Sequence, residues 1–191
     1  MRQLAILTFV TLDGVMQAPK LADEDPSGGF TQGGWAAPHW DPVMAQVRAE
    51  AMAQPYDVLF GRKTYETFAA AFGDTGGEHP MDRATKYVAT SSPGELKWSN
   101  SVGLGADIPA AVARLKQQDG PLLQVHGSAQ LVQTLLAHEL VDEFRLWTFP
   151  VLVGPGKRLF ENPPPGPMTL VKSVVGPTGV VMGIYRRTLV A

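Results

Sequence analysis

The sequence feature that most constrains the fold is a short apolar segment that runs through one glycine into a helical pattern. Residues 56–60 (YDVLF) have the composition of a buried strand, and Gly61 separates them from a segment suited to a helix. Arg62, Lys63 and Thr64 then stand at the start of the predicted helix. Because a helix N-terminus presents unpaired N–H groups and a positive dipole end, this junction predicts a phosphate site. A solvated basic corner is the alternative.

A second junction of the same kind follows the apolar segment 122–126. Residues 127–129 (GSA) are small, so a ligand could approach their backbone closely, and several N–H groups in such a turn can bind a diphosphate. A tight turn that needs glycine for its dihedral angles is the alternative reading. Thr90 and Ser91 add hydroxyl groups at the end of another predicted strand, 86–90. Together these features suggest a ligand with more than one phosphate.

Strand-like and helix-like segments alternate along the chain, which predicts an α/β fold with right-handed crossovers, helices on both faces and a mostly parallel sheet. The two final strand-like segments flank a Gly-Pro-Thr-Gly turn and predict an antiparallel C-terminal hairpin. A polar loop is expected over residues 73–82. The strands are expected at 4–12, 56–60, 86–90, 122–126, 143–149, 169–175 and 180–187, with a weaker one within 98–104; the helices are expected to begin at Asp41, Thr64, Asp107 and Gly127. In such a sheet the strand ends at Asp13, Gly61, Thr90-Ser91 and Gly127 would converge on one cleft.

Length and charge limit the remaining possibilities. A chain of 191 residues can bury one sizeable core, so residues 1–191 are expected to form a single domain. The net charge of −2 argues against a broad nucleic-acid or membrane surface, so any anion site must be a local cluster. The absence of cysteine excludes disulfides and thiolate–zinc sites, and the four histidines lack metal spacing, so no metal is expected. With no signal peptide or membrane span in the sequence, a cytoplasmic protein is expected.

Asp13 and the long segment 17–40 are the remaining candidates for function. A carboxylate at the end of the most buried predicted strand can orient a substrate or pass a proton, whereas an Asp-Gly turn is the structural alternative. A loop as long as 17–40 often serves as a lid or binding loop. Its Trp35 and Trp40 could flank a flat ligand, but packing against the core is the expected role.

Four stretches give the chain a resemblance to the dihydrofolate reductase-like fold. Within that fold it resembles the reductase domain of bacterial bifunctional riboflavin-biosynthesis deaminase-reductases. The stretches, which together span almost the whole chain, are 11–14 (TLDG), 60–66 (FGRKTYE), 126–128 (HGS) and 150–160 (PVLVGPGKRLF). The second and fourth are fairly specific, whereas the other two are weak alone. The resemblance implies a three-layer fold, NADPH as hydride donor and a homodimer.

The resemblance also implies roles for particular residues. The cofactor-binding set would be Val10 and Thr11 beside the nicotinamide, Gly61, Arg62, Lys63 and Thr64 at the phosphates, Thr90 and Ser91 towards the adenosine 2′-phosphate, and Gly127, Ser128, Ala129 and Gln130 around the diphosphate. Asp13 would be catalytic and, with Trp35, would face the substrate. Asp41 is matched by its position to the substrate-binding acid of the helix that follows.

Two departures from the family limit the functional prediction. Dihydrofolate reductases have a Gly-Gly pair where this chain has Gly127-Ser128, and the zinc deaminase partner domain needs cysteines that the chain lacks. Neither folate reduction nor the riboflavin-pathway step is therefore fixed. The predicted function is an NADPH-dependent reductase of a small heterocyclic or carbonyl substrate. A non-catalytic nucleotide-binding or regulatory module is the alternative, and a phosphosugar-binding enzyme is a third possibility.

Overall fold

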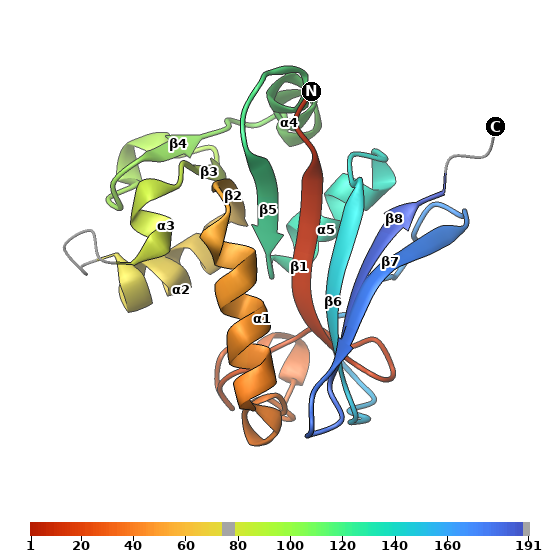
Figure 1. Ribbon diagram of the computed structural model, residues 1–191. Helices are drawn as coiled ribbons and strands as arrows, with labels where there is room; N and C mark the ends of the chain where they lie inside the picture. The colour runs from red at the N-terminus through yellow and green to blue at the C-terminus, as the bar shows by residue number, and fades with distance from the viewer. Residues whose placement is uncertain (74–78, 189–191) are drawn as a thin grey trace.

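β1 (Leu4–Thr11) lies inside the sheet, because its side chains are mostly apolar and most are buried. The structure is a computed structural model that describes residues 1–73 and 79–188 (Figure 1). The other strands are β2 (Tyr56–Gly61), β3 (Lys86–Ala89), β4 (Ser101–Gly103), β5 (Leu122–His126), β6 (Glu143–Phe149), β7 (Met168–Val175) and β8 (Val181–Arg187). They form one eight-stranded sheet in the order β4-β3-β2-β5-β1-β6-β8-β7.

The strands from β4 to β6 pair in parallel, and only the C-terminal hairpin is antiparallel. β1 lies between two parallel partners, since Ala5 pairs with Gln124 of β5 and with Glu143 of β6. β8 then pairs antiparallel with β6, and β7 pairs antiparallel with β8. The predicted fold class, a mostly parallel sheet with an antiparallel C-terminal hairpin, is confirmed.

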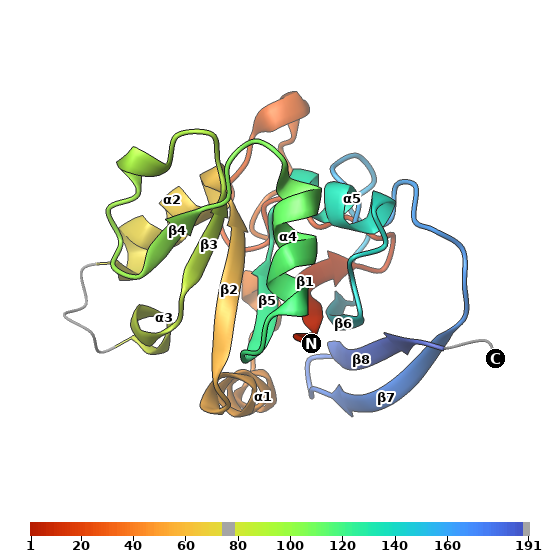
Figure 2. The same ribbon diagram turned by 90° about the horizontal axis from the view of Figure 1, so that it is seen from above.

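Helices cover both faces of the sheet. They are α1 (Pro42–Ala53), α2 (Arg62–Phe72), α3 (Pro80–Arg83), α4 (Ile108–Gln117) and α5 (Ala129–Ala137). Leu59 of β2 packs with α4 and α5, whereas its neighbours Val58 and Phe60 pack with α2 and α3 on the opposite face. Figures 1 and 2 show α1 and α5 on opposite sides of the sheet. No helix among residues 1–73 and 79–188 is long and apolar enough to cross a bilayer.

Three of the helices begin at a side-chain cap. Asp41 accepts a hydrogen bond from a backbone N–H in the first turn of α1, and Asp107 does the same for α4, as the sequence predicts. His79 caps α3, a helix that overlaps the end of the segment 73–82, where the sequence predicts only a polar loop. The prediction of a loop is therefore wrong for residues 80–82, because a local capping box stabilises a helical turn there. Residues 74–78 of that predicted loop lie outside the described part of the chain.

The long segment 17–40 is fixed to the core. It contains two short 3₁₀ turns, η1 (Ser27–Gly29) and η2 (Ala37–His39). Trp35 is only 8% exposed; its indole N–H donates to the carbonyl of Gln17 at 2.9 Å, and its ring meets Phe149 edge-on. The core-packing role expected for Trp35 is therefore the one that the structure shows.

Candidate functional site

The carboxyl ends of four parallel strands meet at one edge of the sheet, and the two glycine junctions are neighbours there. Leu59 of β2 pairs with Val125 of β5, so Gly61 and Gly127 lie two residues further along adjacent strands. The N–H of Gly61 donates to Oγ of Ser128 at 2.9 Å. A Cβ atom on Gly127 would lie 3.7 Å from the Thr64 methyl group. The two junctions predicted from the sequence therefore lie side by side and are directly bonded.

The helices that leave these two junctions lack side-chain caps. Within residues 1–73 and 79–188, neither the N-cap residue of α2, Gly61, nor that of α5, Ser128, makes a side-chain cap hydrogen bond. The other α-helices of the described chain, α1, α3 and α4, are all capped by their own side chains. The N–H groups of Ala129 and Gln130, in the first turn of α5, therefore stay open to a ligand, as do those at the start of α2. An anion is the partner that such helix ends favour.

The backbone of the second junction is left-handed. Gly127 has a φ of +57° and Ser128 a φ of +60°. Glycine adopts this conformation without steric cost, so the turn alone accounts for Gly127. A Cβ at Gly127 would be in ordinary van der Waals contact with the Thr64 methyl group, so the close approach of a ligand at this turn stays a prediction.

Arg62 and Lys63 differ in whether carboxylates of the protein already neutralise them. Nε of Arg62 lies 2.6 Å from Glu66 and its NH2 group 3.0 Å from Glu95, and NH1 donates to the carbonyl of Ser92 at 3.3 Å. The Glu66 carboxylate, with Glu95, raises the pKa of Arg62. Lys63 is exposed and, in residues 1–73 and 79–188, forms no ion pair. Of the two predicted phosphate-binding cations, Lys63 is therefore the one available without displacing a carboxylate.

The remaining predicted cofactor residues lie on either side of the junctions. Ala89 of β3 pairs with Gly61, which places Thr90 and Ser91 beside the exit of β2. The Thr90 hydroxyl accepts from the N–H of Ser92 at 3.1 Å, and Ser91 is exposed. Val10 and Thr11 lie at the exit of β1 and are 5% and 1% exposed. The strand order thus places the predicted residues along one line, from β1 through β5 and β2 to β3.

Asp13 joins the exits of β1 and β6. Its carboxylate accepts from the Thr11 hydroxyl at 2.5 Å and from the N–H groups of Val153 and Gly154 at 3.2 and 2.8 Å. The hydrogen bond from Thr11, together with those from the backbone, lowers the pKa of Asp13 from 3.8 to about 2. Asp13 is therefore ionised at neutral pH. It binds the segment after β6, about 140 residues further along the chain, a role that the sequence did not reveal. Its catalytic role stays a prediction.

Asp41 and Trp35, the other predicted substrate contacts, are both engaged in the fold. Oδ1 of Asp41 accepts from the N–H of Met44 at 2.9 Å, and Oδ2 accepts from the Thr178 hydroxyl at 2.7 Å. Asp41 therefore ties α1 to the turn between β7 and β8. The structure assigns both side chains a structural role, and contact with a substrate stays a prediction for each.

His126 is a candidate to which the sequence prediction assigns no functional role. Its Nε2 lies 3.0 Å from Oε1 of Gln124, and its ring lies beside Phe60 and Phe68. Burial, and then the positive charges of Lys20, Arg48 and Arg145, lower the pKa of His126 to about 3. The imidazole is therefore neutral at the exit of β5. The only sequence signal was its position immediately before Gly127.

Three aromatic rings lie on the α1 side of the sheet, near the exits of β1 and β6. Phe9 and Trp147 are register partners with stacked rings 5.2 Å apart. Trp40, which is 43% exposed, stacks on Trp147 at 5.9 Å. Sequence spacing could not find this group, because its members come from three separate segments.

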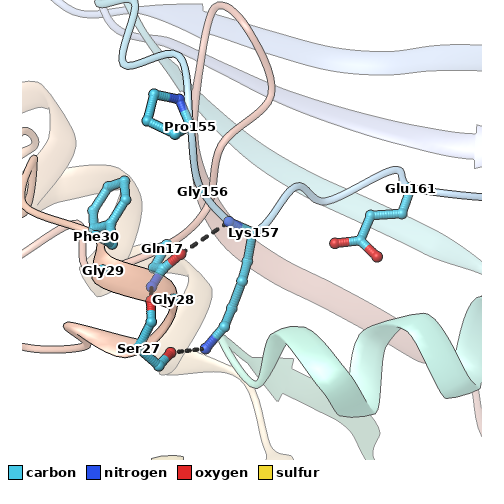
Figure 3. A pocket seen from close by; sticks show the side chains of 9 residues that line it. All are labelled: Gln17, Ser27, Gly28, Gly29, Phe30, Pro155, Gly156, Lys157 and Glu161. Atoms are coloured by element: carbon cyan, nitrogen blue, oxygen red, sulfur yellow. Dashed lines mark hydrogen bonds between the residues drawn. The ribbon is translucent and has the colours of Figure 1, made fainter.

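A separate hollow of about 310 Å³ lies between the long loop and the segment after β6 (Figure 3). Gln17 organises its wall: the side-chain N–H groups donate to the carbonyls of Asp25 and Ser27, and Oε1 accepts from the N–H of Lys157. The Lys157 ammonium reaches Asp25 at 2.5 Å and Ser27 at 2.7 Å. None of the predicted cofactor residues lines this hollow, so the strand-exit edge is a distinct site.

The sheet order and the paired glycine junctions define an α/β protein of the dihydrofolate reductase-like class. Solved structures with this fold include a putative riboflavin biosynthesis protein from Shewanella sp. PV-4 (TM-score 0.68, 17% identity, 98% of this chain and 99% of that one). A pyrimidine reductase-like protein from Corynebacterium diphtheriae has a TM-score of 0.66 at 12% identity, over 99% and 93% of the chains. Dihydrofolate reductase from Enterococcus faecalis, complexed with NADP(H) and RAB-propyl, has a TM-score of 0.61 at 16% identity, over 97% and 96%.

The chain belongs to the RibD C-terminal domain family, whose model matches residues 2–182. Two relatives from Bacillus subtilis (strain 168) are uncharacterized proteins. YyaP is 30% identical over 170 residues, which are 83% of this chain and 80% of YyaP. YwjB is 32% identical over 108 residues, which are 55% of this chain and 58% of YwjB.

The hydrogen bonds of Asp13 predict a pH-dependent effect of Asp13→Asn. Because the folded state lowers this pKa to about 2, the ionised carboxylate stabilises the protein above about pH 4, and the contribution is lost as the pH falls through the folded value. At pH 7 we expect the variant to melt about 2–6 °C below the wild type. The difference should shrink towards pH 2. A constant difference in thermal melts from pH 7 to pH 2 would contradict this role for the carboxylate.

Proposed function

We propose that the protein is an NADPH-dependent reductase that transfers a hydride to a small heterocyclic or carbonyl substrate. The observation that carries the proposal is the pair of bonded strand exits at Gly61 and Gly127, each of which opens into a helix without a side-chain cap. Two such helix ends side by side suit a diphosphate. Family membership supports a reductase-type fold, and one solved structure of the same fold is a dihydrofolate reductase with NADP(H).

The predicted cofactor residues along this edge favour one orientation of a dinucleotide. The nicotinamide would lie by β1 at Val10 and Thr11, and the diphosphate at the exits of β5 and β2. The adenosine end would then lie by β2 and β3, near Arg62 and Ser91. When bound, the cofactor supplies the hydride. The chain orients the nicotinamide and shields it from water with the buried strand β1.

The protonation states at this edge indicate where the accompanying proton comes from. Asp13, with a pKa of about 2, and His126, with a pKa of about 3, both lack an acidic proton at neutral pH. Neither side chain can therefore act as a general acid there. We assign the proton that completes the reduction to water at the substrate.

A non-catalytic nucleotide-binding module is the rival that a direct assay separates. The purified protein is titrated with NADPH and with NADH while tryptophan fluorescence is followed, and NADPH oxidation is then measured with a panel of cyclic imines, pteridines, pyrimidines and aldehydes. A reductase binds NADPH and oxidises it only when an acceptor is present. Binding of NADPH without turnover of any acceptor would favour the module, and indifference to NADPH would contradict both.

Lys63 provides the sharpest test of the phosphate assignment. Because Lys63 is exposed and has no carboxylate partner in the described chain, Lys63→Gln removes a charge without disturbing an ion pair. We expect NADPH affinity to fall about tenfold and NADH affinity less than about threefold, since the 2′-phosphate is the difference between them. Equal losses for both nucleotides in the fluorescence titration would show that Lys63 does not bind the extra phosphate.

We also propose a homodimer that uses the C-terminal hairpin. β7 is an edge strand, and several of its apolar side chains and one from β8 are exposed: Met168, Leu170, Val171, Val175 and Val181. Leu170 pairs with Tyr185 and Val175 with Val181, so these positions share one face of the sheet. Figure 2 shows the hairpin as the outer part of the sheet. Apolar faces of this kind are typical of interfaces between subunits.

The dimer is tested by a double substitution, Leu170→Lys with Val175→Lys. We expect a monomer by size-exclusion chromatography with light scattering, because four like charges would face one another across the interface. Thr169→Lys is the matched control, since Thr169 pairs with Arg186 and lies on the other face of β7. A dimer that survives the double substitution, with unchanged circular dichroism, would place the interface elsewhere.

A further inference from the structure

Each of the three guanidinium nitrogens of Arg62 bonds to a protein group. Glu66, one turn further along α2, holds Nε at 2.6 Å. Glu95, at the end of the short turn η3 (Pro93–Glu95) after β3, holds NH2 at 3.0 Å. NH1 points to the carbonyl of Ser92 at 3.3 Å. The segment that follows β3 therefore covers the edge formed by NH1 and NH2. A phosphate would bind that edge with two parallel hydrogen bonds.

This edge lies at the adenosine end of the line of strand exits. The line runs from β1 through β5 and β2 to β3, and Arg62 connects the exit of β2 with the segment after β3. If the diphosphate lies at Gly127 and Gly61, the ribose beyond it extends towards Arg62 and Ser91. The phosphate that distinguishes NADPH from NADH would then meet the covered edge of Arg62.

We propose that Glu95 is a specificity-determining residue that competes with the cofactor 2′-phosphate for Arg62 and so limits the preference for NADPH over NADH. The proposal rests on the proposed function of the strand-exit edge. Glu95 is an exposed side chain on a short turn, and exposed ion pairs are weak, so a phosphate can displace it. Until displaced, Glu95 also repels the phosphate. With NADH, which lacks that phosphate, Arg62 and Glu95 can stay paired.

Glu66 has a different role, although it also neutralises Arg62. It binds Nε from the same helix, four residues away, and leaves the NH1–NH2 edge uncovered. A phosphate can bind that edge while Glu66 stays in place. Glu66 is thus a positioning residue that holds the guanidinium plane, whereas Glu95 occupies the position that the phosphate needs.

The test compares three charge-removing substitutions of exposed glutamates. Glu95→Gln removes the competitor, and Glu66→Gln removes the positioning partner. Glu161→Gln makes the same charge change in the segment after β6, where Glu161 lines the separate hollow. Dissociation constants for NADPH and NADH are measured by tryptophan fluorescence on the full chain at low and physiological salt, with thermal melts as a check on folding.

We expect Glu95→Gln to tighten NADPH about three- to tenfold and to change NADH less than about twofold. The gain should shrink as salt screens the charges. Glu66→Gln should not tighten NADPH, and Glu161→Gln should leave both constants within about twofold. Unchanged melting of Glu95→Gln would show that the effect lies in binding and not in stability.

Other results overturn the proposal. Weaker NADPH binding by Glu95→Gln would mean that Glu95 positions Arg62, and weaker NADH binding would mean that it contacts the ribose hydroxyls. If the wild type binds both nucleotides and Glu95→Gln changes neither, only this inference fails. If the wild type binds neither nucleotide, the proposed function fails as well.

Discussion

The hydrogen bond from the Gly61 N–H to the Ser128 hydroxyl is the interaction on which the strand-exit edge depends. It joins adjacent strands at the point where β2 turns into α2 and β5 turns towards α5. Ser128 can make this bond because its backbone is left-handed, with a φ of +60°. The bond gives a physical reason for the departure from the Gly-Gly pair of dihydrofolate reductases. A second glycine would suit the turn but could not fasten it to β2, whereas serine at this position does so at the cost of backbone strain.

The two ends of this edge are fixed by different means. At the β1 end, Asp13 and Gln17 bind backbone groups of the segment after β6, so that segment and the start of the long loop form one rigid wall. At the β3 end, the connection is a pair of exposed ion pairs from Arg62. Exposed ion pairs exchange readily with solvent or a ligand, whereas the β1 end is held by several hydrogen bonds at once, two of them part-buried. The edge thus combines a rigid β1 end with an adjustable β3 end.

The sequence predicted the architecture well because the relevant signals are local. The strand 143–149 matches β6 residue for residue, and the helix start at Asp107 coincides with an observed cap. Both rest on patterns within a few residues. The helix after Gly61 begins at Arg62, two residues earlier than predicted, because it needs no capping side chain at its start. α3 was missed because its cap is a histidine, a residue that sequence rules do not associate with helix starts.

The chemistry of the candidate site could be predicted only in part, since its decisive pairs are distant in the chain. No sequence pattern connects Arg62 with Glu95, or Asp13 with Gly154, although each pair is bonded in the structure. Residue type and spacing identified the cations and the turn, but not which charges are already neutralised. The anion site was consequently attributed to Arg62 and Lys63 alike. Of these two cations, only Lys63 lacks an ion pair in the part of the chain that the structure describes.

If the strand-exit edge holds the cofactor as proposed, the choice of acceptor falls to the α1 side of the sheet beside β1. There the neutral His126 lies across β1 from Arg145, because Leu7 pairs with both. Phe9 and Trp147 lie two residues further towards the exits of β1 and β6, and the Trp40 ring stacks on Trp147. A planar acceptor could stack on the rings while its polar groups meet the imidazole and the guanidinium. On the proposed function, we expect relatives that share the phosphate edge but differ at these positions to reduce different acceptors with the same cofactor.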